Sequence, residues 1–195
     1  MIPQHLVDLS RPLDADQPRF PSDPPILHTV YPDDGFLIDH IELVGPTGTH
    51  VDTPRHVHHT LPGLEIVQPL LALFVIRPGD SVDHIAPGTF VALHTGCALT
   101  DPAAPGWSLE QLRVLHKRGV AAVGHDTMNT DPAEFAFDGH FPGQQFWLRN
   151  GHWQVESLTN LDRVPREGAH IFVGVPKLSN AGSFPARVYA LWDDQ

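Results

Sequence analysis

Short segments in which apolar and polar residues alternate occupy the first half of the chain. In an extended strand, this alternation places apolar side chains on one face and polar side chains on the other. Glycine and proline mark the turns between such segments. The pattern predicts strands at residues 5–10, 26–31, 40–45, 70–79 and 89–96. We therefore expect the first half of the chain to be predominantly β.

The second half introduces a helical pattern. Ser108 and Gln111 have the spacing of a capping box, and leucines recur every third residue from position 109 to position 115. Gly119 suits the C-terminal end of this helix because glycine readily adopts positive φ. A buried strand is expected directly afterwards, at residues 120–124.

A second helix is expected to begin at Pro142, since the first helical turn tolerates proline, and to end at Gly151. The remaining expected elements are strands at 152–156, 171–176 and 186–192 and a helical turn at 158–162. No internal repeat or linker-like segment divides the chain. We expect an α/β fold with a mixed, strand-rich sheet and a few helices, forming one domain over residues 1–195.

The composition is that of a soluble protein, with 41% hydrophobic and 18% charged residues among 195. No apolar run approaches the ~20 residues that span a membrane, and the N-terminal segment lacks the pattern of a secretory signal. The single cysteine, Cys97, cannot form an internal disulfide, which agrees with a reducing compartment. We expect a cytoplasmic protein without a membrane partner.

The charge of the chain argues against a nucleic-acid partner. The formal net charge is -11, and the longest cluster of basic residues is the pair Lys117 and Arg118. The 14 histidines point instead to metal binding or proton transfer, because histidine is the commonest metal ligand and a frequent general base. Their positions decide which role applies.

Residues 48–59, GTHVDTPRHVHH, contain four of these histidines. Side chains two positions apart on a strand share a face at about 6.5–7 Å, so His50 and Asp52 can converge on one small ion. Pro54 interrupts strand pairing and places His56 just past the end of the strand. That position suits a proton carrier better than a fixed ligand.

Imidazole nitrogen and carboxylate oxygen together suit zinc or manganese. The alternative is that His50 and Asp52 form a hydrogen-bonded pair at a sheet edge, with His56, His58 and His59 in a solvated loop. Two ligands do not make a closed metal site. Further ligands are therefore needed from elsewhere in the chain.

The segment GTHVDTPRH resembles the HxGTHxDxPxH signature of the cyclase family of metal-dependent hydrolases, which includes bacterial-type kynurenine formamidase and isatin hydrolase. Other segments resemble the family in the same order along the chain: HLVDLSRPL, GLEIVQPLLALFVI, VGHDTMNTD, VESLTNLDRVP and PKLSNAGSFPARVYAL. The resemblance implies a swivelling β/β/α-type domain, homodimers or homotetramers, and hydrolysis of an amide or lactone-like bond at one or two divalent metals.

By this resemblance, His50, Asp52 and Glu156 occupy metal-ligand positions and His56 occupies the position of the proton carrier. Two further ligand positions, which are histidine in the family, carry Pro46 and Gln144 here. Proline offers no ligand atom, and a neutral amide oxygen is a weak ligand for zinc. We therefore expect one zinc or manganese ion, not two.

Another histidine could replace a missing ligand. His140 lies one helical turn before Gln144, His40 precedes the expected site strand, and His58 and His59 follow it closely. Each of these histidines is more often an ordinary loop or surface residue.

Three functions remain open, and we rank them in the order given. The first is hydrolysis of a small aryl formamide, cyclic amide or related C–N bond with one metal and His56. The second is a metal-independent cyclase, dehydratase or isomerase that uses His56 with Asp52 or Glu156. The third is a non-catalytic small-molecule-binding or assembly module. For the first, Phe36, Trp107, Phe146, Trp147 and Trp153 could supply an apolar substrate pocket, although each of these aromatics is more often a core residue than a substrate contact.

Overall fold

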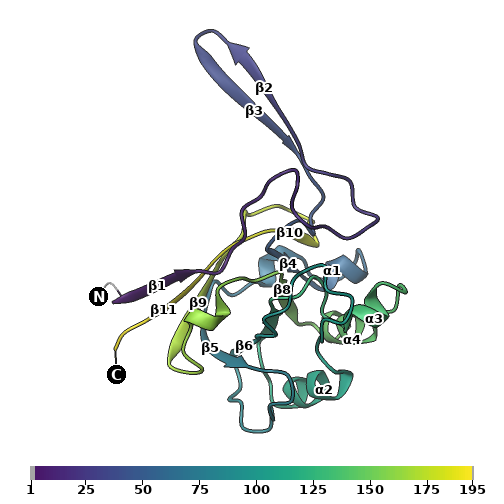
Figure 1. The fold of residues 1–195 in the computed structure, drawn as a ribbon, viewed down its shortest axis with the longest axis vertical. Coiled ribbons are helices and arrows are strands. Elements are labelled where there is room, and N and C mark those ends of the chain that lie inside the picture. Colours follow the sequence, from purple (N-terminus) through teal and green to yellow (C-terminus); the bar gives the residue numbers. More distant parts are fainter. Residues whose placement is uncertain (1–2, 195) are drawn as a thin grey trace.

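A nine-stranded sheet forms the centre of the fold in the computed structural model, which describes residues 3–194 (Figure 1). The strands lie in the order β1-β11-β9-β5-β6-β7-β8-β4-β10. Their bounds are β1 His5–Asp8, β4 His50–Asp52, β5 Leu70–Ile76, β6 Phe90–Leu93, β7 Ala122–His125, β8 Trp153–Glu156, β9 Ala169–Gly174, β10 Ser183–Pro185 and β11 Arg187–Trp192. Strands β5 to β8 are parallel, and all other pairs are antiparallel. The expected mixed, strand-rich α/β fold is confirmed.

Few helices accompany the sheet. They are α1 Pro54–Val57, α2 Leu109–Lys117, α3 Ala133–Ala136 and α4 Pro142–Arg149, with short 3-10 helices at Leu64–Ile66 and Leu161–Arg163. Helices α2 and α4 pack against each other. Their buried side chains join those of β6 and β7 in one hydrophobic cluster, and a second cluster includes Val51, Phe90 and Val155.

The sequence signals at the ends of the two longer helices are confirmed. Ser108 and Gln111 form the reciprocal capping box, with both hydrogen bonds at 3.1 Å, and Gly119 adopts a φ of 73° after the helix. Pro142 begins α4, and Gly151 follows it with a φ of 88°. These signals act within a few residues, which is why they can be read from the sequence.

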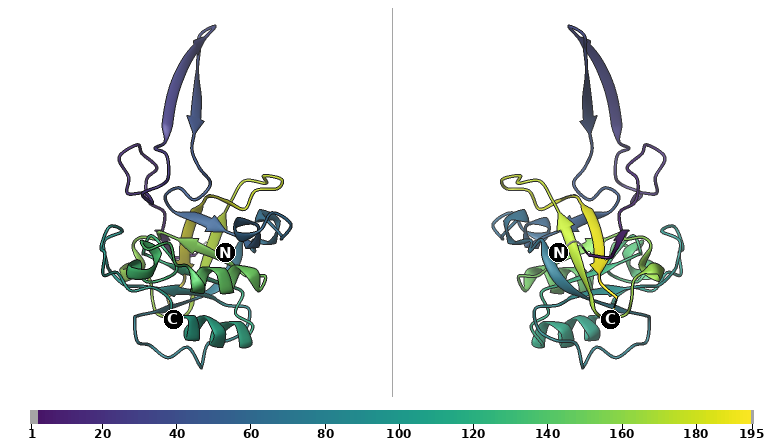
Figure 2. Two further views of the ribbon diagram at one scale, coloured as in Figure 1. Left: turned by 90° about the vertical axis from the view of Figure 1, so that its right-hand side faces the viewer. Right: turned by 90° about the vertical axis from the view of Figure 1, so that its left-hand side faces the viewer.

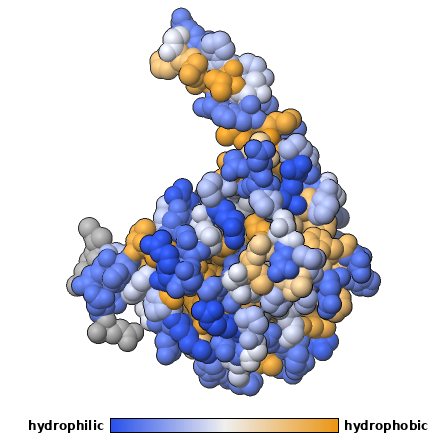
Figure 3. Space-filling view, viewed as in Figure 1, coloured by the Kyte–Doolittle hydropathy of each residue, from blue (hydrophilic) through white to orange (hydrophobic). Residues whose placement is uncertain are grey.

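Strands β2 (Leu27–Asp33) and β3 (Phe36–Glu42) pair only with each other among the described residues. They form a hairpin that projects as an arm from the body of the molecule (Figures 1, 2 and 3). The expected strand at residues 40–45 is wrong in its bounds, because Asp34 and Gly35 form a tight turn with positive φ values of 41° and 88°. The Asp-Gly pair therefore starts β3 at Phe36, earlier than expected.

No helix within residues 3–194 has the length and apolar character required to cross a bilayer.

Candidate metal centre

The pairing of β4 with β8 assembles the candidate site. In this antiparallel pair, His50 lies opposite Glu156 and Asp52 lies opposite Gln154. Residues at alternate positions of a strand point to the same side of the sheet, so these four polar side chains share one face. Val51 and Val155 point to the opposite face and are part of a hydrophobic cluster. Alternation along each of the two short strands thus places the polar residues of the candidate site on one face of the sheet and core residues on the other.

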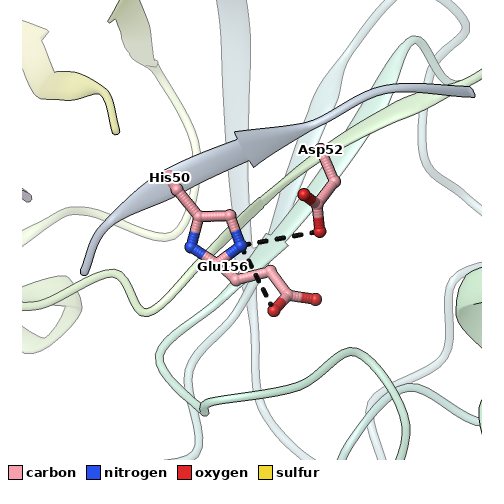
Figure 4. A group of neighbouring side chains, drawn as sticks. All are labelled: His50, Asp52 and Glu156. Atoms are coloured by element: carbon pink, nitrogen blue, oxygen red, sulfur yellow. Dashed lines mark ion pairs between the residues drawn. The ribbon is translucent and has the colours of Figure 1, made fainter. Parts of the chain in front are cut away.

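The side chains of His50, Asp52 and Glu156 point toward one another and approach to ion-pair distance (Figure 4). His50 Nε2 is 3.5 Å from Asp52 Oδ2 and 3.6 Å from Glu156 Oε2. One ligand atom from each residue lies within 4.8 Å of the others, and all three residues are buried. The expected ligand trio is therefore brought together at one point.

The orientation of His50 suits a metal ligand. Its Nδ1 atom is 2.9 Å from the carbonyl oxygen of Gly48, so Nδ1–H can donate there and leave the lone pair of Nε2 directed at the two carboxylates. The 3.5 Å separation from Asp52 is long for a hydrogen bond. Among residues 3–194, neither His50 Nε2 nor Asp52 Oδ1 has a hydrogen-bond partner, and both atoms are buried. This nitrogen and this oxygen, which lack hydrogen-bond partners, are the types of atom that bind a divalent cation.

The electrostatics of the trio also favour positive charge. Burial alone would lower the pKa of His50, but the carboxylates of Asp52 and Glu156 outweigh burial and raise this pKa to about 9. Burial would likewise raise the pKa of Asp52, but His56 and His50 lower it to about 2. The site therefore keeps Asp52 ionised and stabilises a cation beside it.

Gln154, Gln144 and Thr130 hold the two carboxylates in place through hydrogen bonds. Gln154 Nε2 donates to Glu156 Oε1 at 2.8 Å and lies 3.4 Å from Asp52 Oδ2. Gln144 Nε2 donates to Asp52 Oδ2 at 3.2 Å, and Thr130 Oγ1 donates to Glu156 Oε1 at 3.0 Å. These donors hold Glu156 through Oε1, so that Oε2 faces His50 Nε2. They hold Asp52 through Oδ2, the same oxygen that lies 3.5 Å from His50 Nε2.

Gln144 is itself held in place by the start of α4. Asp131 accepts hydrogen bonds from the backbone N–H groups of Gly143 at 2.7 Å and Gln144 at 2.9 Å. A Cβ atom on Gly143 would lie 2.8 Å from Asp131 Oδ1, so only glycine fits this approach without a shift. Gln144 therefore reaches the site as a firmly placed amide that donates a hydrogen bond to Asp52.

His56 lies at the edge of the trio, in the short helix α1. Its Nδ1 atom is 3.8 Å from Asp52 Oδ1 and 3.4 Å from Ser183 Oγ, and one third (33%) of its side chain is exposed. Thr53 donates through N–H and Oγ1 to the carbonyl oxygen of Gly182, and this loop packs closely against His56. The expected placement of His56 just past the end of the strand is confirmed.

The trio lines a cavity of about 420 Å³. Its walls include Phe20, Met128 and Phe141, with Arg19 and Asp23 among its polar residues. Pro46 also lines the cavity but has no atom that can bind a metal. This volume lies within the range typical of small-molecule sites.

The five aromatic residues considered for the substrate pocket do not line the cavity, and the alternative that they pack in the core holds for the three tryptophans. Trp107, Trp147 and Trp153 are core residues with at most 2% exposure, Phe146 packs against the core, and Phe36 lies on the arm. The cavity aromatics, Phe20 and Phe141, lie 6.1 Å apart between ring centroids. They were missed because both lie in irregular segments, where neither periodicity nor spacing indicates direction.

The other candidate histidines lie away from the trio. His140 is exposed and does not line the cavity, and His40 stands on the arm against Tyr31. His58 and His59 are exposed and stack on each other. His125, which sequence reasoning did not single out, is fully buried 3.6 Å from Glu156 Oε1. Gln154 was also missed, although it shares the alternation that places Glu156 on the site face.

With this geometry established, comparison with known proteins identifies the family. The sequence profile of the Cyclase family, described as "Putative cyclase", matches residues 7–132, well over half of the chain. The chain belongs to the cyclase family.

Relatives of this cyclase-family chain cover nearly its whole length. The kynurenine formamidase of Paracidovorax citrulli is 29% identical over 212 residues, covering 95% of each chain. The structure of isatin hydrolase A from Labrenzia aggregata, bound to benzyl benzoate, matches with a TM-score of 0.78 and 21% identity, covering 97% of this chain and 94% of that one.

A predicted metal-dependent hydrolase from Bacillus stearothermophilus matches with a TM-score of 0.70 and 23% identity, over 95% of this chain and 97% of that one. At these identities the two structural matches establish the cyclase fold. The relative from Paracidovorax citrulli is named a kynurenine formamidase, and that name bears on the function proposed for this cyclase-family chain.

Proposed function

We propose that this protein is a metal-dependent hydrolase that cleaves the C–N bond of a small aryl formamide or cyclic amide. The observation that carries the proposal is the convergence of His50, Asp52 and Glu156 within 4.8 Å at the floor of a small-molecule cavity. The names of the relatives, kynurenine formamidase and isatin hydrolase, support this reaction class.

The proposed cofactor is one divalent ion, zinc or manganese, held by His50 Nε2 and by one oxygen from each of Asp52 and Glu156. Imidazole suits zinc and carboxylate suits manganese, so this ligand set is compatible with either ion. When bound, such an ion supplies Lewis-acid chemistry: it polarises a carbonyl and makes water a stronger acid. Gln144 and Gln154 orient the two carboxylates for it through their amide N–H groups.

His56 is the proposed proton carrier. Its Nδ1 atom faces Asp52 Oδ1 at 3.8 Å and Ser183 Oγ at 3.4 Å, which leaves Nε2 to exchange a proton with substrate. An imidazole ring can accept a proton at one nitrogen and return it, as an acid, to the leaving nitrogen. The partial exposure of His56 lets the ring reach the cavity, whose lining includes it.

The cavity suits an aromatic substrate of modest size. Phe20 and Phe141 provide apolar walls, and Phe20 also stacks near Phe137 at 6.5 Å between centroids. An aryl ring between these walls would direct its formyl or ring carbonyl towards the trio at the floor. The polar residues of the cavity would then contact substituents of the ring.

The test is turnover of a panel of N-formylated arylamines and cyclic amides by purified protein, with and without a chelator. We expect C–N hydrolysis that is lost on chelation, restored by zinc or manganese, and absent from His50→Ala. His140→Ala, an exposed histidine outside the cavity, is the matched control and should keep full activity. Turnover that is indifferent to chelator would contradict the proposal and favour metal-free acid–base chemistry.

A further inference from the structure

Three buried side chains in the segment that begins at the end of β7 lie around Glu156: those of His125, Thr127 and Thr130. The three residues are at most 3% exposed, and none of them lines the cavity. Burying a polar side chain costs free energy unless its hydrogen bonds are made inside the protein. Because these side chains do not face a molecule in the cavity, their contacts with Glu156 indicate their role.

Backbone hydrogen bonds fix this segment against the residues that follow Glu156. The N–H group of Ser157 donates to the carbonyl oxygen of Thr127 at 3.1 Å. The N–H group of Leu158 donates to the carbonyl oxygen of His125 at 2.9 Å. The two backbones are therefore held in register, and the side chains of one are presented to the other at fixed positions.

The orientation of the His125 ring follows from its contacts with Thr127. The ring Nδ1 atom is 2.9 Å from the Thr127 hydroxyl oxygen and 3.1 Å from the Thr127 carbonyl oxygen. A carbonyl oxygen only accepts, and the Thr127 hydroxyl donates its hydrogen to the carbonyl oxygen of Asn129 at 3.0 Å, so Nδ1–H is the donor to both. The opposite edge of the ring then places Nε2 at 3.3 Å from Thr130 Oγ1 and 3.6 Å from Glu156 Oε1.

Thr130 directs its hydroxyl at one oxygen of Glu156. Its Oγ1 atom donates to Oε1 at 3.0 Å, and Gln154 Nε2 donates to the same oxygen at 2.8 Å. A carboxylate oxygen has about two lone-pair sites, so two donors fill Oε1. The other oxygen, Oε2, lies 3.6 Å from His50 Nε2. The two oxygens of Glu156 thus have different surroundings.

We propose that Thr130 and His125 are positioning residues for Glu156. Thr130 holds Oε1 by its hydroxyl, and His125 holds Thr130 in the rotamer that makes this bond. Glu156 then offers only Oε2 to a cation, which leaves coordination positions for water and for the substrate carbonyl, as a catalytic site requires. The cation rests on the proposed function, whereas the orientation of Glu156 is a property of the protein without metal.

The test is the affinity of the full chain for zinc in Thr130→Val and Thr130→Ser, measured by titration with a competing metal indicator. Valine has nearly the shape of threonine but no hydroxyl, whereas serine keeps the hydroxyl. We expect Thr130→Val to bind zinc about 10–100-fold more weakly than the wild type and Thr130→Ser to retain the wild-type affinity. Thr89→Val, at a buried threonine outside the cavity, is the matched control and should also retain it.

The part played by His125 has its own variant. His125→Phe keeps an aromatic ring in this fully buried position and removes both ring nitrogens. The affinity for zinc should fall by about tenfold or more, because Thr130 loses the contact that holds its rotamer. His152→Phe, at a histidine outside the cavity, is the control and should bind zinc like the wild type. An unchanged affinity in His125→Phe would overturn the role of His125.

Crystals of the metal-free protein give a second measurement that requires no bound ion. In Thr130→Val the carboxylate of Glu156 should rotate, so that Oε2 leaves its position 3.6 Å from His50 Nε2. In Thr130→Ser it should keep that position. A Glu156 that does not move in Thr130→Val, or a loss of affinity that is as large in Thr130→Ser as in Thr130→Val, would overturn the proposal.

These outcomes can be told apart from failure of the proposed function. A wild type that hydrolyses no aryl formamide or cyclic amide, while the variants show the expected affinities, would overturn the proposed reaction and leave the role of Thr130 intact. A wild type that binds no metal would overturn the proposed function, and the metal-free crystals would then decide whether Thr130 orients Glu156.

Discussion

His50 on β4 lies directly opposite Glu156 on β8, and its Nε2 atom is 3.6 Å from Oε2 of that glutamate. The two residues are far apart in sequence, so a single strand pair creates the candidate metal centre. Gln154 lies two positions before Glu156 on the same face, and its Nε2 atom contacts the carboxylates of both Glu156 and Asp52. The candidate metal ligands and the amide of Gln154 that supports them therefore all depend on the register of the β4–β8 pair.

Replacing Gln154 tests the supporting donors. Gln154→Met keeps a side chain of similar length in a fully buried position but removes the N–H groups that hold Glu156 and Asp52. We expect the affinity for zinc or manganese to fall by about 10–100-fold, as for other residues that orient metal ligands. Titration with a competing metal indicator measures the affinity. Gln68→Met, at an exposed position, is the control, and equal affinities for the two variants would refute the role of Gln154.

Replacing His56 separates proton transfer from metal binding. His56→Ala should keep the bound metal, because His56 is 33% exposed and lies outside the ligand trio. The turnover number should fall by about 10²–10⁴-fold, the usual contribution of a positioned acid or base. Parallel measurements of metal content and of amide hydrolysis check this. Loss of metal together with activity would show that His56 acts as a ligand.

Introducing histidine at Pro46 and Gln144, the two positions that the family resemblance implies as ligands, should change the number of bound ions. Gln144 Nε2 lies 3.2 Å from Asp52 Oδ2, and Pro46 lines the same cavity. The double variant Pro46→His/Gln144→His replaces an amide donor and a ring without donor atoms by two imidazole ligands. We expect metal content per chain to rise from about one towards about two ions. An unchanged content of one ion in a folded variant would show that these positions do not limit the site.

The pair formed by His116 and His152 predicts a dependence of stability on pH. His116 Nδ1 is 2.9 Å from His152 Nε2, and His152 stacks on Trp147 at 3.9 Å. Burial first, and then the charge of His116, lower the pKa of His152 below 6.5. The unfolded chain therefore binds this proton at higher pH than the folded chain, so stability is complete above about pH 6.5 and declines as the pH falls towards the lowered pKa.

His152→Phe keeps an aromatic ring against Trp147 and removes the titrating group. The free energy of unfolding, measured with urea between about pH 5 and pH 7.5, should then vary less with pH than in the wild type. His140→Gln, at an exposed position, should retain the wild-type dependence. A His152→Phe profile parallel to that of the wild type would refute the assignment.

Local signals in the sequence predicted much of the fold. The capping box of α2, the start of α4 at Pro142 and the shared face of His50 and Asp52 depend only on residues a few positions apart. The Asp34-Gly35 turn is an equally local signal. Because it was not used, the predicted strand at residues 40–45 began later than β3, and the hairpin was not predicted. That error came from reading a strand pattern without its turn.

The remaining features depend on contacts between distant segments. The amide donors Gln144 and Gln154 meet at Asp52 because α4 and β8 both adjoin β4 in space. The cavity walls at Phe20 and Phe141 come from irregular segments whose direction is set by packing. Contacts between distant segments leave no periodic pattern in the sequence, so the tertiary structure is required to identify them.

Metal content tests the central claim most directly. Protein produced with zinc and manganese in the medium should contain about one divalent ion per chain when measured by elemental analysis, since one imidazole and two carboxylates form one site. His50→Ala should lose nearly all of it, while His140→Ala should retain it. A wild-type protein without metal, or a folded His50→Ala variant with a full equivalent, would contradict the account.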